Sequence, residues 1–226
     1  MDLDGPALIQ CQREIEAKYK VRVQNFTVDL EDEIQRTDLI SKLVTQNKKL
    51  NVLVNCAALV GTSNLSGWNE NFENQSISTW RRALEVNLTA VFQLCQGLYP
   101  TMKKSAGASI INIGSIYGAL GPDWRLYKDL NMANPAAYAA SKGGLIQLTR
   151  WLATTLAPDV RVNAVSPGGI ERNQNKEFIA RYLSKTPLGR MATEQDLQGV
   201  LVFLASDLSS YVTGQNITVD GGWSIW

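Results

Sequence analysis

The chain of 226 residues contains no histidine, which removes the commonest acid–base side chain and the commonest zinc ligand from its chemistry. Its three cysteines, Cys11, Cys56 and Cys95, have no metal-ligand spacing, and their odd number argues against a disulfide framework. We therefore expect no metal site. A reducing cytoplasm is the simplest setting for such a chain.

Strong charge and long apolar runs are also missing. The formal net charge is +1, so the sequence gives no reason to expect nucleic acid or an anionic membrane as a partner. No apolar run is long enough to span a bilayer, and the acidic segment Met1 to Asp4 lacks the basic flank and apolar stretch of a signal peptide. These absences indicate a protein that works without nucleic acid and without a membrane.

What is present predicts one α/β domain over residues 1–226, because this length allows one sizeable core but not two. Apolar runs alternate with helical periods, which implies a parallel sheet with helices on both faces and ligands at the carboxyl ends of its strands. Strands are predicted at 21–28, 51–55, 108–114, 160–165 and 216–219. Helices are predicted after Asp4, at 31–49, at 77–104 with a break near Pro100, at 135–156, within 168–187 and from Thr193, with a loop at 61–76.

Tyr138 and Lys142 form the most informative pair in the chain. Four residues apart on a predicted helix, they lie on one face, one turn from each other. An ammonium beside a phenol favours the phenolate and lowers its pKa, which makes a tyrosine usable as an acid or base near neutral pH. Taken alone, such a pair is usually two solvated surface neighbours, so its meaning depends on its surroundings.

Other polar residues stand where predicted strands end. Ser115 follows one strand, Asn55 ends another, and Pro167-Gly168 follows a third. Each also has a plain structural interpretation: Ser115 and Pro167-Gly168 as turn formers, and Asn55 as a link between neighbouring strands. Asn87, inside a helix, would be either a solvated residue or one associated with a helix kink. Trp80, Trp151 and Phe203 are expected to pack in the core.

Six segments occur in a characteristic order along the chain. They are Asn55-Cys56-Ala57-Ala58 after a strand, Asn87 within a helix, Ser115 after Gly114, the Tyr138/Lys142 pair, Arg161 to Gly168, and Tyr211 to Gly222. Together they resemble the motifs of the short-chain dehydrogenase/reductase family, and the resemblance covers essentially the whole chain. It implies a Rossmann-like, doubly wound sheet in a three-layer α/β/α arrangement.

The resemblance implies hydride transfer between a nicotinamide cofactor and a substrate that interconverts as alcohol and carbonyl. Tyr138 would exchange the proton of the substrate oxygen, Ser115 would hold that oxygen, Lys142 would bind the nicotinamide ribose and lower the pKa of the phenol, and Asn87 would keep a water in a proton relay. The positions that match cofactor contacts in the family are Asp2, Asp29, Leu30, Asn55, Ala57, Tyr138, Lys142, Pro167, Gly168 and Ile170.

The largest departure from the family is its glycine-rich turn, which has no counterpart here, because Gly5 is the only glycine before Gly61. The family opens with a strand-helix-strand unit of on the order of 30 residues that carries this turn. We expect its loss to separate the strand at 21–28 from that at 51–55 and to leave the latter unpaired. The expected explanation is a start codon assigned too late, and the alternative is a truncated, non-catalytic remnant that acts only as an oligomer subunit. Asp2 would favour NAD over NADP.

Further departures concern the substrate. Ser115 and Tyr138 stand 23 positions apart, wider than in most of the family, and the extra residues include Trp124 and Arg125. Arg172 occupies about the position of the family's usual threonine near the nicotinamide. Trp124, Arg125 and Arg172 are therefore the predicted substrate residues, and a sugar-like substrate is expected from a resemblance to a bacterial branch linked to sugar and flagellin-glycan biosynthesis. Family members are commonly homodimers or homotetramers, and the apolar tail from Trp223 to Trp226 fits burial against a neighbouring subunit.

Overall fold

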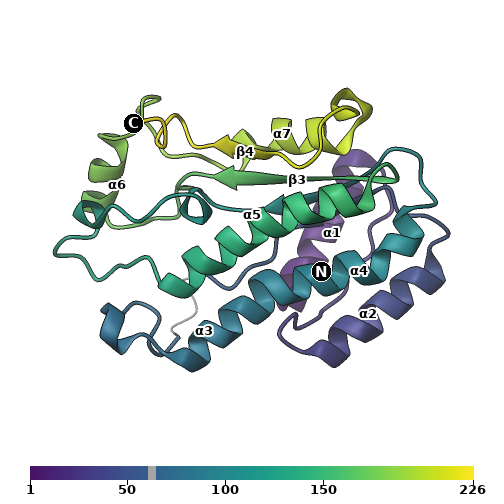
Figure 1. Ribbon diagram of the computed structural model, residues 1–226, viewed down its shortest axis with the longest axis horizontal. Helices are drawn as coiled ribbons and strands as arrows, with labels where there is room; N and C mark the ends of the chain where they lie inside the picture. Colours follow the sequence, from purple (N-terminus) through teal and green to yellow (C-terminus); the bar gives the residue numbers. More distant parts are fainter. Residues whose placement is uncertain (61–64) are drawn as a thin grey trace.

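The computed structural model describes residues 1–60 and 65–226, so the first part of the predicted loop, residues 61–64, lies outside the described residues. Its centre is a parallel sheet (Figure 1). In the described part of the chain this sheet has four strands in the order β1 (Val52–Asn55), β2 (Ala108–Ile113), β3 (Val160–Pro167) and β4 (Asn216–Val219). The predicted parallel strands from 51 onward are confirmed.

Helices cover both faces of the sheet, as the alternating pattern predicted. They are α1 (Gly5–Tyr19), α2 (Glu33–Gln46), α3 (Ile77–Leu84), α4 (Ala90–Met102), α5 (Ala136–Leu156), α6 (Lys176–Leu183) and α7 (Gln195–Ala205). Figure 1 shows α2 to α5 together on one face, while α7 packs on the opposite face of β2 and β3. The chain therefore has the Rossmann-like α/β/α layers expected from its sequence.

Strand residues alternate between two cores. Ile110 and Val162 belong to the core that α2, α4 and α5 cover, whereas Ile111 and Val165 pack against α7. All four are fully buried. A strand that is apolar on both sides can only lie inside a sheet with helices on each face, which explains the continuous apolar runs in the sequence.

The segment at 21–28 is not a strand, so this prediction is wrong. Its only ladder contact within the described residues is a single parallel bridge between Asp2 and Thr27. The β-rich composition of the segment does not suffice, because a strand forms only where a neighbour offers its backbone. As expected, the segment is separated from β1, whose Val54 is 41% exposed, and β1 forms an edge of the described sheet.

The long helix at 77–104 changes its hydrogen-bonding pattern at a different place from the one predicted. Pro100 lies within the last turn of α4 without interrupting it. The irregularity is instead a π-helical turn, Glu85–Thr89, between α3 and α4, with the buried Asn87 at its centre. Such turns widen the helix by one residue and are frequent at functional sites. The kink-associated interpretation of Asn87 is thus correct.

Arg36 joins α2 to the rest of this face. Its guanidinium is 1% exposed and donates to the Leu30 carbonyl oxygen (2.5 Å), the Gln93 amide oxygen (2.5 Å) and the Glu85 carboxylate (2.6 Å). One buried side chain therefore fixes the turn at Leu30, the π-helical turn and α4 relative to one another.

A further hydrophobic cluster, rich in aromatic side chains, lies beyond the carboxyl ends of β2 and β3. It joins the segment after Ser115, helix α6 and the C-terminal tail, and its buried members are Ile116, Leu126, Tyr127, Phe178, Tyr182, Met191 and Trp223. Trp223 stacks on Tyr182 in its own chain with ring centroids 5.7 Å apart, while Ile225 and Trp226 are 75% and 76% exposed. Only the last residues of the tail are thus free to meet a neighbour.

The described residues contain no helix with both the length and the apolar character needed to cross a membrane. Among the tryptophans expected in the core, Trp80 packs against a small cluster with Trp68 and Ala83, whereas Trp151 is 54% exposed on α5. The core position predicted for Trp151 is therefore wrong, because its helix turns that side chain away from the sheet.

Candidate active site

The predicted site residues Ser115, Tyr138 and Lys142 meet at the carboxyl end of β2. Ser115 lies just past the end of the strand and caps a short 3₁₀ turn, Ile116–Gly118, through a hydrogen bond from the Tyr117 amide (3.2 Å). This turn lies directly on α5, where a Cβ at Gly118 would come within 2.7 Å of the Lys142 carbonyl carbon. The close approach explains why glycine stands there and brings Ser115 to the tyrosine.

Lys142 is buried and directed at the strand end. Its ammonium donates to the carbonyl oxygen of Ile113 at 2.7 Å and lies 5.8 Å from the centroid of the Tyr138 ring. The side chain is 3% exposed, and burial lowers the pKa of the amine to about 8, with a smaller opposite effect from Cys56. The Tyr138/Lys142 pair is therefore not a pair of solvated surface neighbours.

The pKa of Tyr138 differs from the sequence-based prediction. Burial raises the pKa of the phenol, and a hydrogen bond with Ser115 partly offsets this rise. The ammonium of Lys142 donates to the Ile113 carbonyl oxygen and is not among the causes of the shift in the pKa of Tyr138. The prediction that Lys142 lowers the pKa of Tyr138 below its ordinary value is therefore wrong for this structure, because desolvation of the phenolate has the larger effect.

Asn87 connects three elements behind this group. Its amide oxygen accepts a hydrogen bond from the Leu59 backbone amide (2.7 Å), and its amide nitrogen donates to the Leu59 carbonyl oxygen (3.3 Å) and the Ser141 hydroxyl (3.0 Å). Ser141 in turn donates to the carbonyl oxygen of Tyr138 (2.8 Å). The π-helical turn, the segment after β1 and the first turn of α5 are thus held by one carboxamide.

Asn55 has the structural contacts that the sequence favoured for it. Its amide nitrogen donates to the Asn112 side chain on β2 (2.8 Å), and Asn112 donates in turn to Thr149 on α5 (2.9 Å). This buried chain of polar groups ties the sheet to α5.

Four of the predicted cofactor positions line one cavity beside the segment that follows β1. Asp2, Asp29, Leu30 and Ala57 share a cavity of about 260 Å³. Asp2 and Asp29 come from the segments joined by the bridge with Thr27, whereas Ala57 follows β1. The structure therefore brings together residues that are 55 positions apart in the chain.

The predicted positions after β3 form a tight backbone corner. The Gly168 amide donates to the Val219 carbonyl oxygen (2.9 Å), and a Cβ at Gly168 would meet the Tyr182 hydroxyl at 2.8 Å. Ile170 makes a backbone bridge with Ala192. Pro167 ends β3 beside Val219. Glycine is required at 168 because atoms of two other segments lie too close to leave room for a Cβ there.

A much larger cavity, of about 950 Å³, lies between the segment around Phe72, the segment that includes Trp124, and the first turns of α5. Of the three predicted substrate residues, Trp124 lines this cavity. The Arg125 guanidinium is paired with Asp123, and that of Arg172 with Glu194, and both arginine side chains are largely exposed. The structure therefore places Trp124 on the cavity wall and pairs both arginines with carboxylates outside that lining.

A family model described as enoyl-(acyl carrier protein) reductase matches residues 3–224. The chain belongs to the short-chain dehydrogenase/reductase family. Its relatives include the 3-oxoacyl-(acyl-carrier-protein) reductase FabG of Thermotoga maritima, 35% identical over 208 residues that cover 89% of this chain and 77% of that protein.

Two further relatives bear on the chemistry. The 2-dehydro-3-deoxy-D-gluconate 5-dehydrogenase of Dickeya dadantii is 31% identical, with 98% of this chain and 85% of that protein covered. The crystal structure of a short-chain dehydrogenase from Leptospira borgpetersenii with bound NAD+ matches with a TM-score of 0.81 and 35% identity, covering 97% of this chain and 88% of that chain. The relatives are thus named as oxidoreductases of the same family.

Two places among the described residues could hold parts of a dinucleotide. The cavity of Asp2, Asp29, Leu30 and Ala57 suits one end, and the buried ammonium of Lys142 suits the other. The N-terminus of α1 offers no phosphate site, because the Asp4 carboxylate already caps it through the Ala7 amide (2.9 Å). A capping carboxylate repels the phosphate that a glycine-rich turn would bind.

Sequence reasoning missed several residues of the large cavity, above all Asn134 and Trp80. Trp80 was assigned to the core alone, although it borders both the small cluster and the cavity. Asn134 stands four positions before Tyr138 and next to the residue that opens α5. The sequence shows that Asn134 lies close to Tyr138 in the chain, but it does not show that the Asn134 side chain is buried.

Proposed function

We propose that this short-chain dehydrogenase/reductase is an NAD(P)-dependent oxidoreductase that interconverts an alcohol and a carbonyl, with residues 1–226 acting as one domain. The observation that carries the proposal is the convergence of Ser115, Tyr138 and Lys142 at the carboxyl end of β2, in a desolvated setting. This is the edge at which parallel α/β sheets bind ligands.

In this proposal each residue has one task. The Tyr138 hydroxyl takes or gives the proton of the substrate oxygen, and Ser115, which lowers the pKa of that phenol, holds the same oxygen. Lys142 supplies a positive charge beside the phenol, which matters more because the surroundings exclude water. Asn87 acts through Ser141 and Leu59 to hold the first turn of α5 in place.

We assign the adenosine end of the cofactor to the cavity of Asp2, Asp29, Leu30 and Ala57, and the nicotinamide ribose to Lys142 and Tyr138. When bound, the nicotinamide supplies or accepts the hydride. A carboxylate at Asp2 disfavours the extra phosphate of NADP, so we favour NAD. The Leptospira relative with bound NAD+ supports this choice. We assign Asn55, Pro167, Gly168 and Ile170 to the walls that position the cofactor rather than to direct chemistry.

The test is nicotinamide reduction by the protein in the presence of alcohols. We expect the absorbance of reduced nicotinamide to rise with NAD+ and at least one of sorbitol, gluconate and cyclohexanol, and to rise less with NADP+. Isothermal titration should give binding of NAD+ even where no alcohol is turned over. Neither reduction nor binding with either dinucleotide would overturn the proposal and favour the alternative of a non-catalytic subunit.

We further propose that the protein is a homodimer or homotetramer that pairs through the outer faces of α3, α4 and α5. Ile77, Phe92 and Trp151, one on each of these helices, are 64%, 40% and 54% exposed. Apolar side chains gathered on one face indicate an interface. We expect Trp151→Glu to lower the mass measured by light scattering to that of a monomer. Val21→Glu, at an exposed position near α1, is the control; an unchanged mass for Trp151→Glu contradicts this interface.

A further inference from the structure

The cavity of about 950 Å³ adjoins the candidate active site through an aromatic pair. Tyr127 lines the cavity, and its hydroxyl lies 2.8 Å from that of Tyr117, two residues past Ser115. Ala136 and Ala139 in the first turns of α5 form another part of the wall, on either side of Tyr138 in the sequence. The cavity therefore borders the first turns of the helix that carries Tyr138 and the segment that follows Ser115.

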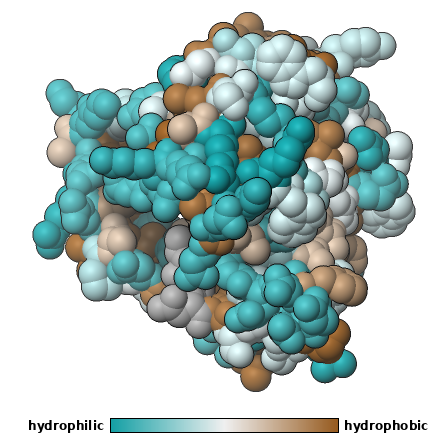
Figure 2. Space-filling view, turned by 90° about the vertical axis from the view of Figure 1, so that its left-hand side faces the viewer, coloured by the Kyte–Doolittle hydropathy of each residue, from teal (hydrophilic) through white to brown (hydrophobic). Residues whose placement is uncertain are grey.

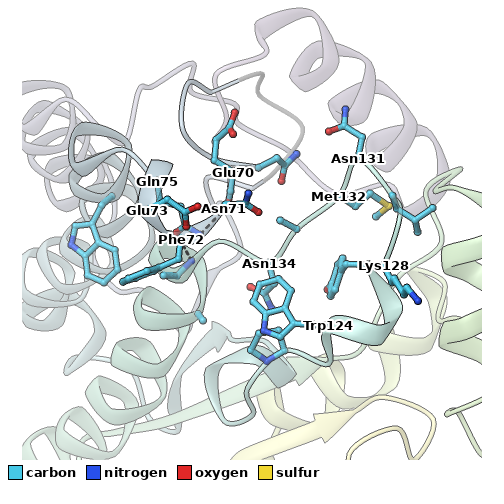
Figure 3. A pocket seen from close by; sticks show the side chains of 18 of the residues that line it. Glu70, Asn71, Phe72, Glu73, Gln75, Trp124, Lys128, Asn131, Met132 and Asn134 are labelled. Carbon is cyan, nitrogen blue, oxygen red and sulfur yellow. Dashed lines mark hydrogen bonds between the residues drawn. The ribbon is translucent and has the colours of Figure 1, made fainter.

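Asn134 is the unusual residue of this cavity. Its side chain is 6% exposed, and neither its amide nitrogen nor its amide oxygen has a hydrogen-bond partner among the described residues. It is part of the cavity wall, and in Figure 3 it lies between Trp124 and Asn71. A buried carboxamide without partners costs on the order of 1–3 kcal/mol for each unsatisfied group, a cost that a ligand offering a donor and an acceptor removes.

The rest of the lining describes the chemistry of that ligand. The rings of Phe72, Trp80 and Trp124 offer flat apolar surfaces. Side-chain amides and charges lie between and around them, at Asn69, Glu70, Asn71, Glu73, Gln75, Lys128 and Asn131. Aromatic faces combined with amides suit the alternating C–H and O–H groups of a polyol.

Charge in the cavity argues against an anionic ligand. Glu70 and Glu73 face the space with one cation, Lys128, so carboxylates outnumber ammonium groups along the lining. Because Arg125 and Arg172 are paired with Asp123 and Glu194, they add no free positive charge. A carboxylate or phosphate on the ligand would meet net repulsion.

We infer that this cavity binds the substrate as an uncharged, polyhydroxylated compound and that Asn134 is its specificity-determining residue. The inference rests on the proposed function for the reaction itself. The carboxamide of Asn134 accepts from one hydroxyl and donates to a neighbouring one, and Trp80 and Trp124 cover the C–H faces. Acyl chains do not fit this assignment, because they leave both polar atoms of Asn134 unpaired.

The experiment compares Asn134→Leu with the wild-type protein, using sorbitol, gluconate and cyclohexanol as probes. Saturation-transfer NMR and the KM for each alcohol give independent readings of affinity. We expect sorbitol to be the best ligand of the three, and Asn134→Leu to weaken its binding at least about tenfold, since two hydrogen bonds are lost. Binding of cyclohexanol should change less than threefold. Asn134→Asp, which preserves the size of the side chain, should weaken sorbitol binding as well.

The matched control is Asn74→Leu, an exposed asparagine on the neighbouring segment that does not line the cavity, and it should leave all three affinities unchanged. Stronger binding of gluconate than of sorbitol, or an unaltered sorbitol affinity in both Asn134 variants, overturns the inference. Because NMR reports binding without turnover, these results stand whether or not nicotinamide is reduced. Sorbitol binding without any dinucleotide binding would contradict the proposed function while retaining the site.

Discussion

Replacing Tyr138 with phenylalanine should lower kcat by about 10²- to 10⁴-fold, the usual contribution of a positioned acid or base. The substitution removes a single oxygen atom. The ring keeps its packing against the cluster of Trp68, Ala83 and Ala137, so the melting temperature and the affinity for NAD+ should remain close to those of the wild type. Steady-state kinetics, thermal unfolding and titration with NAD+ measure the three quantities.

Tyr211→Phe is the matched control, because that tyrosine is fully exposed and has no part in the site. In the wild type, alcohol oxidation should accelerate as the pH rises, since burial raises the pKa of Tyr138 and keeps the phenol protonated near neutrality. The Tyr138→Phe variant should lose this dependence together with its activity. Residual turnover above about a tenth of the wild-type rate would contradict the role given to the phenol.

Arg36→Met should lower the free energy of unfolding by about 3 kcal/mol. This is the largest effect on stability that we expect from a single substitution at a buried position. Methionine preserves the apolar stem but removes the donors to Leu30, Gln93 and Glu85. The first two acceptors then lose this donor in a partly buried environment. For a chain of this size, such a loss lowers the melting temperature by about 6–12 °C, which calorimetry or circular dichroism can follow.

The matched control for the stability loss of Arg36→Met is Arg82→Met. Arg82 also pairs with a carboxylate, that of Glu31, but its side chain is 45% exposed. Exposed ion pairs contribute about 0–1 kcal/mol. Equal losses in the two variants would show that the buried network of Arg36 has no special role. Because Leu30 lines the cavity assigned to adenosine, Arg36→Met should also weaken NAD+ binding.

Local patterns predicted most of the elements, since each rests on interactions among near neighbours. The Asp4 carboxylate caps α1 as its position beside Pro6 indicated, and the apolar run from Val52 produces β1. The prediction of a strand at 21–28 was wrong for the opposite reason. A strand depends on a neighbour that may be far away in the sequence, and among the described residues the only β-bridge of this segment is the one with Asp2.

The site also has features that the sequence predicted and features that depend on distant segments. The spacing of Tyr138 and Lys142 placed both side chains on one helical face, and the order of Ser115, Asn87 and the pair indicated the family. The pKa of Tyr138 could not be predicted from that spacing, because it depends on how far packing removes the phenol from water and where the ammonium of Lys142 finds its acceptor.

By itself, the sequence determined the family, the parallel sheet and the residues that we propose to handle the proton, because short-range periodicity and motif order encode these features. Only the tertiary structure decided that Arg125 and Arg172 are paired away from the cavity and that Asn134 is buried in it without a partner. Burial and pairing arise from segments distant in the chain, such as those around Phe72, Trp124 and α5, and no local pattern records which of them close on one another.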